Sequence, residues 1–363
     1  QVLLRIIIIS FLSFINFINI SQILKIILNS NVLKFLYLIL IYFVISSIWS
    51  VYPLWTAYKS IELLIMVTSL FLYVDLEGSP FKVLKKLMIF LGTLISLTYF
   101  NIIIGNPVNQ YGIKQYGLFS TFPIINPASV ALFSLYFLCL INFLRLDNIK
   151  TKLLFIFSLV TLFLSQNRST LISLVVLTIL YALFHKNFLK LRFALIIAPI
   201  FFIISPLRNI IFTYLSRGDS NYSLMTLSSR TITWAYSFST MVKQSVLNQL
   251  FGFGAFAGVR FKIAPESFFS NLKNVSIFST DNFWLDTFID NGILGLILII
   301  TFFIYLITII KRIKDYRFRW FLISIFVIFM TRSIFTTNIF YRESLMFYFL
   351  VSSVSQFPKL LED

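Results

Sequence analysis

Long apolar runs separated by short polar segments follow one another along almost the whole chain. Runs of about 17 to 25 residues recur, which is the length needed to cross the hydrocarbon core of a bilayer. The pattern predicts about eleven membrane-spanning helices. Their expected limits are 2–20, 32–49, 58–74, 84–104, 124–144, 153–164, 169–184, 193–205, 292–310, 320–335 and 339–357. The expected fold class is therefore an all-α polytopic membrane protein.

The composition supports this fold class. Only 12% of the 363 residues are charged, and 59% are hydrophobic. A soluble domain carries about 25% charged residues, so this chain has too little charge to cover a water-facing surface. The first residue is Gln1 and not Met, from which we expect that part of an N-terminal span is missing.

Lys and Arg are distributed unequally between two sets of connections. The connections after the first, third, fifth, seventh and ninth predicted spans contain Lys25, Lys82, Lys85, Lys86, Arg145, Lys150, Lys152, Lys186, Lys190, Arg192, Lys311, Arg312, Lys314, Arg317 and Arg319. The short connections of the other set contain only Lys114 and Arg168. Because short basic loops stay in the cytoplasm, the richer set is expected inside. The net charge of +17 therefore follows the topology and does not indicate nucleic-acid binding.

This orientation divides the chain into four parts. Residues 1–205 are expected to form eight spans, 206–291 a large loop on the outer face, 292–357 three spans and 358–363 a cytoplasmic tail. The large loop is basic, with Arg208, Arg217, Arg230, Lys243, Arg260, Lys262 and Lys273. An anionic ligand would explain these residues, and attraction to anionic lipid headgroups is the alternative.

Residues 229–247 of the large loop are predicted to form an amphipathic helix. Apolar side chains recur there at spacings of about three to five, at Ile232, Tyr236, Met241, Val242 and Val246. This pattern is typical of a helix that lies on the membrane surface. Gly252 and Gly254, which follow, would let the backbone turn or approach a ligand closely.

Several charged residues lie near the outer ends of the predicted spans. Arg168 is in a very short outer turn, and an ionisable group at membrane depth is costly and often functional. Snorkelling of the side chain to the headgroups is the alternative. Arg332 lies near the outer end of a later span, and Lys59 lies one helical turn from Glu62. For these residues neutralisation by a neighbour is the expected role.

Three carboxylates, Asp281, Asp286 and Asp290, precede an apolar run without charge. Asp286 and Asp290 are four residues apart and share a helical face, where they would start the helix, favoured by its dipole, and balance the basic loop. Asp281 points elsewhere, and helix capping is the alternative to a catalytic role for it. No metal-binding cluster occurs in this stretch or in the loop, so no metal or other cofactor is expected.

Four stretches together resemble the family of O-antigen ligases and O-antigen polymerases (Wzy). In chain order they are YGLFSTFPIINPAS; SQNRSTLISL; SSRTITWAYSF with LFGFGAFAG; and TDNFWLDTFIDNGILGL. Their order on this topology makes the match specific, and it covers most of the chain. The resemblance implies a GT-C-like fold of about twelve spans, so that one helix is expected to be missing before Gln1.

The resemblance also implies a set of site residues. The family holds the pyrophosphate of a polyprenyl-linked sugar donor with Arg from the short outer turn and from the large loop. By position these are similar to Arg168 and Arg230. Weaker candidates for this role are Arg217 and Arg260. The family's ligases place a His before the Asn that opens the span after the large loop, whereas this chain has Asp281 before Asn282. That difference argues against ligase activity and leaves polymerase activity open.

The function that the resemblance implies is metal-independent glycosyl transfer on the outer, periplasmic face of the bacterial inner membrane. A growing O-antigen, capsule or exopolysaccharide chain would move from undecaprenyl pyrophosphate to a lipid-linked repeat unit. Asp281 would be the general base, with Asn282, Asp286 and Arg332 as secondary candidates. Membrane lipid and a chain-length regulator protein are the other expected partners.

Two further functions stay open at this point. One is an O-antigen ligase, which would transfer the finished glycan to lipid A-core. The other is a lipid-linked oligosaccharide flippase or another transporter. A transporter is expected to carry charges near the bilayer midplane, whereas the charges of this chain gather at the outer ends of its predicted spans. This placement favours an enzyme of the outer face.

Overall fold

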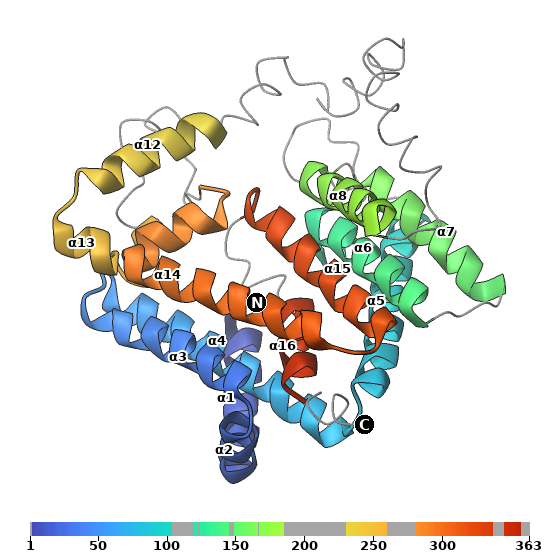
Figure 1. Cartoon of the computed structure of the whole chain (residues 1–363), viewed down its shortest axis with the longest axis horizontal. Coiled ribbons are helices and arrows are strands. Elements are labelled where there is room, and N and C mark those ends of the chain that lie inside the picture. Colours follow the sequence, from blue (N-terminus) through green and yellow to red (C-terminus); the bar gives the residue numbers. More distant parts are fainter. Residues whose placement is uncertain are drawn as a thin grey trace. The chain divides into compact units, whose positions relative to one another are not determined.

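The computed structural model describes residues 2–103, 120–121, 124–125, 127–144, 149–165, 167–184, 230–259, 280–336 and 345–356. These residues are almost entirely helical, which confirms the predicted α-helical class (Figure 1). The exception is a short antiparallel pair between β1 (Ser120–Thr121) and β2 (Ile124–Ile125). The chain divides into two compact units.

The first unit comprises Gln1–Val83, Arg230–Leu322 and Ser333–Asp363. Its elements are α1 (Val2–Ile18), α2 (Ile20–Leu28), α3 (Asn31–Ile45), η1 (Ser46–Ile48), α4 (Pro53–Glu77), α12 (Arg230–Val242), α13 (Val246–Phe251), α14 (Phe283–Arg312), α16 (Leu345–Gln356) and the beginning of α15 (Tyr316–Ser333). The helices α3, α4, α14 and α16 pack together. Aromatic rings fill their contact: the ring of Phe302 on α14 lies 5.6 Å from that of Phe35 and 6.4 Å from that of Phe347, between centroids.

The second unit comprises Leu84–Ser229 and Ile323–Arg332. Its elements are most of α5 (Pro80–Ile103), the strand pair, α6 (Pro127–Leu144), α7 (Ile149–Leu164), α8 (Arg168–Phe184) and the later part of α15. The helices α6, α7 and α8 contact one another. Apolar side chains of α6 form much of this core, among them Val130, Leu132, Leu135, Phe137 and Leu140.

A helix lies on every predicted span except 193–205, which is outside the described residues. Within the described ranges, Asn31–Ile48 and Phe283–Arg312 are long and apolar enough to cross a membrane. The bent pair Arg5–Ile18 and Ile20–Leu28 adds a third span if it counts as one. The total of about eleven spans stays a prediction, since several other helices are shorter or carry more charge.

Helix α14 is broken at Gly292, where φ is 68° and ψ is −170°. A side chain at this position would overlap the backbone of Leu250, so only glycine fits both the left-handed conformation and the space. The break separates a short first segment from the long apolar segment that continues to Arg312. The predicted beginning of this span at residue 292 therefore coincides with a real change in the backbone.

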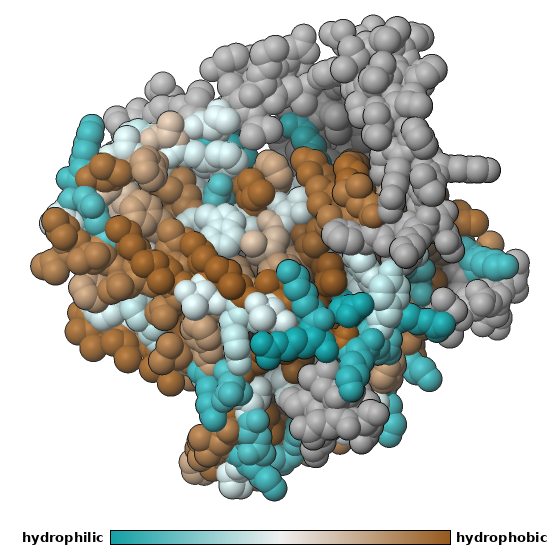
Figure 2. Space-filling view, in the orientation of Figure 1, coloured by the Kyte–Doolittle hydropathy of each residue, from teal (hydrophilic) through white to brown (hydrophobic). Residues whose placement is uncertain are grey.

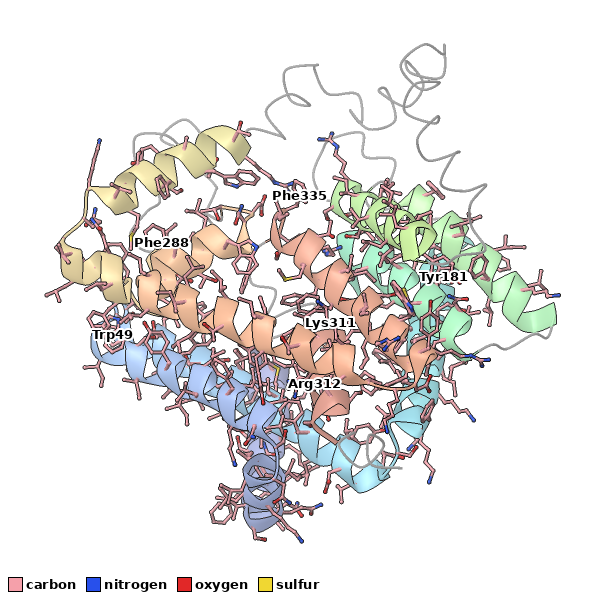
Figure 3. The ribbon with its side chains drawn as sticks, in the orientation of Figure 1. Trp49, Tyr181, Phe288, Lys311, Arg312 and Phe335 are labelled. Atoms are coloured by element: carbon pink, nitrogen blue, oxygen red, sulfur yellow. The ribbon has the colours of Figure 1, made fainter. Side chains whose placement is uncertain are left out.

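The surface of α14 fits a helix that faces lipid. Ile297, Ile300 and Ile304 are exposed on one side of it, and an exposed apolar stripe is stable against hydrocarbon. Figure 2 shows apolar side chains gathered over α13 and along α14, with hydrophilic residues at the C-terminal end of α14. That end carries Lys311 and Arg312 (Figure 3). The first unit is thus part of a membrane protein, with a basic end as expected for its inner side.

Candidate functional site

The beginning of α14 is fixed by Asn282. Its side-chain oxygen accepts hydrogen bonds from the backbone N–H groups of Trp284 at 3.0 Å and Leu285 at 3.1 Å. Asn is among the best residues at a helix N-cap because its side chain satisfies N–H groups that have no partner within the helix. The capping alternative for Asp281 is therefore wrong, since the next residue occupies the cap.

Asp281 forms an ion pair with Arg230. Its Oδ2 accepts a hydrogen bond from Nε of Arg230 at 3.1 Å, and the two side chains are 44% and 32% exposed respectively. The backbone of Asp281 is left-handed, with φ of 52°, a conformation that is uncommon outside glycine. The pair is partly exposed, and an ion pair in contact with solvent contributes little stability, so both groups can change partners when a charged ligand arrives.

The ion pair joins two elements that are far apart in the sequence. Arg230 is the first residue of α12, and Asp281 immediately precedes the cap of α14. Trp234 of α12 donates from Nε1 to the carbonyl of Thr280 at 2.7 Å. The rings of Phe238 and Phe288, one on each helix, lie 6.2 Å apart, and Figure 3 labels Phe288 on α14 next to α12. These contacts hold Arg230 beside the start of α14.

Asp286 lies in the first turn of α14, as predicted. Its carboxylate is buried, however, and only 5% of the residue is exposed. The hydroxyl of Thr280 donates to Oδ1 of Asp286. Contrary to expectation, among the described residues this acid does not pair with a basic side chain of the loop but connects the segment before the helix to its first turn.

Asp290 is also buried, with 6% of the residue exposed. Its two carboxylate oxygens accept hydrogen bonds from backbone N–H groups, Oδ2 from Phe256 at 3.1 Å and Oδ1 from Val259 at 3.0 Å. The prediction that Asp290 starts the helix and balances the basic loop is wrong. Its role is to hold residues 250–259, here called the glycine segment, against α14.

The glycine segment is fastened to α14 through its backbone as well. The N–H of Phe253 donates to the carbonyl of Ile289 at 3.0 Å, and the N–H of Gly254 donates to the carbonyl of Asp290 at 2.9 Å. These carbonyls belong to the turn just before the break at Gly292. The glycine segment thus donates hydrogen bonds to α14 at the point where its backbone leaves the helical conformation.

The glycine segment also contacts the ends of α3 and α4. Trp49 donates from Nε1 to the carbonyl of Phe251 at 3.1 Å, and Trp55 donates from Nε1 to the carbonyl of Phe256 at 3.0 Å. The ring of Trp49, labelled in Figure 3, lies 5.5 Å from that of Phe251. The segment is therefore held on three sides within the first unit.

Gly252 and Gly254 serve this packing. Their φ angles are 72° and 99°, and a Cβ atom would overlap the backbone of Asp290 at Gly252 and Ser50 at Gly254. The sequence predicted a turn or a close approach to a ligand. The close approach that the structure shows is to the protein's own helix and to Ser50.

Replacing Gly254 with Ala is expected to lower the free energy of unfolding by more than about 2 kcal/mol, because strain at positive φ adds to the overlap with Ser50. Gly78→Ala is the matched control. Gly78 has a φ of 64°, and no described atom lies within 4 Å of the Cβ it would gain, so only about 1–2 kcal/mol of backbone strain is expected. Thermal unfolding in detergent measures both. Equal losses would show that the close contact does not matter.

The amphipathic helix predicted for 229–247 is two helices. The helix α12 ends at Val242, and α13 begins at Val246 after Ser245, whose hydroxyl caps it by accepting from the N–H of Asn248 at 3.3 Å. Met241 is buried against the glycine segment and α14, whereas Val242 and Val246 are exposed. The predicted apolar residues therefore do not share one face.

Arg168 and Arg332 belong to the second unit. Arg168 is the first residue of α8, and Asn167 before it accepts from the N–H of Thr170 at 3.0 Å. Arg332 is 2% exposed and donates from Nη1 to the hydroxyl of Thr170 at 2.6 Å. The buried Arg332 thus binds the same turn of α8 that carries Arg168.

Other predicted charges have different outcomes. Lys59 pairs with Glu62 at 3.1 Å, which confirms mutual neutralisation. Arg217 and Arg260 lie outside the described residues. The convergence of Arg168 with Arg230 stays a prediction, since the two residues belong to different units.

The fold and this cluster define a helical membrane protein in which a segment of the large loop is fastened to a broken helix. Residues 153–300 match the sequence model of the O-antigen ligase family, which confirms the predicted resemblance. The match contains the motifs around Arg168, Arg230 and Asp281, whereas the motif at 116–129 precedes it. No curated protein sequence matches the chain. The family points to ligation or polymerisation of lipid-linked glycans.

Proposed function

We propose that the protein polymerises glycan on the periplasmic face of the bacterial inner membrane. A growing chain would move from undecaprenyl pyrophosphate to a sugar hydroxyl of a lipid-linked repeat unit. The observation that carries this proposal is the ion pair between Arg230 and Asp281 beside the capped start of α14. It places a cation suited to pyrophosphate next to a carboxylate suited to proton transfer, both within the family match.

In the proposed reaction the acceptor hydroxyl oxygen attacks the anomeric carbon of the donor glycan. The bond from that carbon to the pyrophosphate oxygen breaks, and undecaprenyl pyrophosphate leaves with the electron pair. The hydroxyl proton passes to the carboxylate of Asp281 as general base. The guanidinium of Arg230 binds the pyrophosphate through paired hydrogen bonds and stabilises its charge as it leaves.

The ion pair sets the order in which donor binding and proton transfer would occur. While Arg230 holds Asp281, the carboxylate is engaged by the guanidinium and is not free to contact the acceptor hydroxyl. A pyrophosphate carries more negative charge than a carboxylate and binds a guanidinium at two points, so the donor would draw Arg230 away. Asp281 would then be released toward the acceptor. Proton abstraction is therefore expected only after the donor has bound.

An O-antigen ligase is the second candidate, and the description of the matched family favours it. A ligase would use the same donor and leaving group but transfer the glycan to lipid A-core. The presence of Asp281 where the ligases have a His argues for the polymerase. The two candidates differ in the acceptor and not in the chemistry of the pyrophosphate.

Purified protein in liposomes tests the proposal, with a synthetic undecaprenyl-pyrophosphate-linked repeat unit as substrate. Glycans of several repeat units are the expected product, with or without added lipid A-core. A product that appears only with lipid A-core and carries a single transferred glycan would establish the ligase. Substrate that crosses the bilayer unchanged would overturn both candidates in favour of a transporter.

Replacing Arg168 with Lys is expected to lower the polymerisation rate at least about tenfold, because Lys keeps the charge but loses the planar fork that binds a pyrophosphate at two points. Arg317→Lys is the matched control, since Arg317 is exposed in the first turn of α15 and is predicted to face the cytoplasm. The rate of chain extension in liposomes measures both variants. An unchanged rate in Arg168→Lys would leave Arg168 with a headgroup-anchoring role only.

A further inference from the structure

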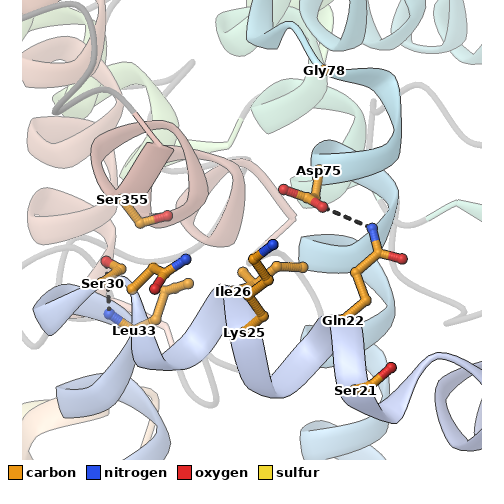
Figure 4. Close-up of a pocket in the computed structure, with 10 residues that line it drawn as sticks. Ser21, Gln22, Lys25, Ile26, Ser30, Leu33, Asp75, Gly78 and Ser355 are labelled. Carbon is orange, nitrogen blue, oxygen red and sulfur yellow. Dashed lines mark hydrogen bonds between the residues drawn. The ribbon is translucent and has the colours of Figure 1, made fainter.

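A polar cavity of about 990 Å³ lies in the first unit, lined by residues of α2, α3, α4 and α16. Its volume is within the range of small-molecule binding sites. The polar groups that line it include Gln22, Lys25, Asn29, Ser30, Asp75 and Ser355, and Figure 4 shows several of them. Neither the proposed reaction nor the family match uses these residues, all of which lie outside 153–300.

The helix that forms one wall of the cavity has the character of a membrane-surface helix. The axis of α2 bends by 76° from that of α1. Ile20, Leu24 and Leu28 are spaced four residues apart and are 54%, 52% and 63% exposed, so they form one apolar face. Lys25 is on the polar face, which lines the cavity. A helix of this kind lies at the level of the lipid headgroups, and the cavity lies there with it.

The cavity combines two opposite charges from different helices. Lys25 extends from α2 toward the middle of the cavity, and Asp75 belongs to α4 (Figure 4). Gln22 donates from Nε2 to Oδ2 of Asp75 at 2.8 Å, which orients the carboxylate. In the part of the chain that the structure describes, the ammonium of Lys25 has no hydrogen-bond or ion-pair partner. A ligand with one anionic and one cationic group would complement this pair.

We propose that the cavity binds the headgroup of a membrane phospholipid that carries a phosphate and a primary ammonium, as phosphatidylethanolamine does. Lys25 and the amide of Asn29 donate to the phosphate, and the ligand's ammonium donates to Asp75. The acyl chains continue along the apolar face of α2. On the predicted topology this site is on the inner side of the membrane, and it does not depend on the proposed glycan transfer.

The first test compares lipids on the full chain, purified in detergent and stripped of lipid. Native mass spectrometry measures binding of phosphatidylethanolamine, phosphatidylcholine and phosphatidylglycerol at equal concentration. We expect phosphatidylethanolamine to bind at least about fivefold more tightly than the others, because a trimethylated amine cannot donate to Asp75 and glycerol carries no charge. Equal binding of the three lipids would overturn the proposal. Displacement of the lipid by millimolar inorganic phosphate would indicate a site for a free anion and would overturn it too.

The second test uses two variants and a control. Lys25→Gln is expected to lower the affinity for phosphatidylethanolamine about tenfold, since a charge-assisted hydrogen bond to the phosphate is lost. Asp75→Asn keeps an oxygen that can accept from Gln22. It is expected to remove the preference for phosphatidylethanolamine over phosphatidylcholine. Lys34→Gln, at an exposed lysine of α3 that bonds to Asn31, should change neither. Wild-type selectivity in both cavity variants would contradict the assignment.

Discussion

Replacing Asp281 with Asn is expected to lower the rate of glycan transfer by about 10² to 10⁴-fold, the range typical for loss of a general base. The amide keeps the size of the side chain and an oxygen that can accept from Arg230, but it cannot take up the acceptor proton. Protein yield and thermal stability should stay close to those of the wild type, because both side chains of the ion pair are partly exposed and such a pair contributes little stability. Chain extension in liposomes measures the rate.

Asp315→Asn is the matched control for this variant. Asp315 caps α15, where its Oδ1 accepts from the N–H groups of Arg317 at 2.9 Å and Phe318 at 3.2 Å. Asn caps a helix about as well as Asp, so full activity is expected. Normal transfer in Asp281→Asn, together with loss in Asp286→Asn, would mean that Asp286 and not Asp281 takes up the proton. Normal transfer in Asp281→Asn with loss in Arg230→Lys would leave Asp281 as a positioning residue.

Replacing Asp290 with Ala is expected to lower the free energy of unfolding by about 2–5 kcal/mol. Two buried N–H groups, those of Phe256 and Val259, lose their acceptors, and each unpaired group costs about 1–3 kcal/mol. The glycine segment should loosen before the whole protein unfolds, which changes the fluorescence of Trp49 and Trp55 at its edges. Thermal unfolding and tryptophan emission in detergent measure the two effects.

Thr301→Ala serves as the control for this variant. Thr301 lies on the exposed side of the same helix, where its hydroxyl donates to the carbonyl of Ile297 at 2.8 Å. Its removal should change stability by less than about 0.5 kcal/mol, as is usual for surface positions. Equal stability of the Asp290 and Thr301 variants would mean that the glycine segment is held by its other contacts alone.

The positions of most helices could be predicted from the sequence because the bilayer sets both the length and the apolar character of a crossing helix. The prediction of 169–184 differs by one residue from α8, which begins at Arg168, and that of 84–104 differs by a few residues from α5, which begins at Pro80. The turn at 243–245 was missed because the apolar spacing continues through it, although Ser245 is a usual helix-capping residue.

The candidate site was predictable only where residue type carries the signal. The pairing of Arg230 with Asp281 joins two family motifs, so the resemblance pointed to both residues. The role of Asp290 was not predictable, because its partners are backbone N–H groups 34 and 31 positions earlier, and almost every residue has such a group. Glycines at 252 and 254 marked a close approach but could not show what is approached.

The break in α14 limits how the glycine segment can move. The carbonyls of Ile289 and Asp290 accept hydrogen bonds from the glycine segment, and that of Asn291 accepts from the hydroxyl of Tyr42 on α3 at 2.8 Å. Lifting the segment would break the bonds to Ile289 and Asp290 but not the one from Tyr42, at about 1–3 kcal/mol for each carbonyl left without its donor. If the protein polymerises glycan as proposed, the growing chain would pass the glycine segment while that segment stays in place. The glycine segment would be a rigid surface along which the glycan moves. Any movement that admits substrates would then involve other segments.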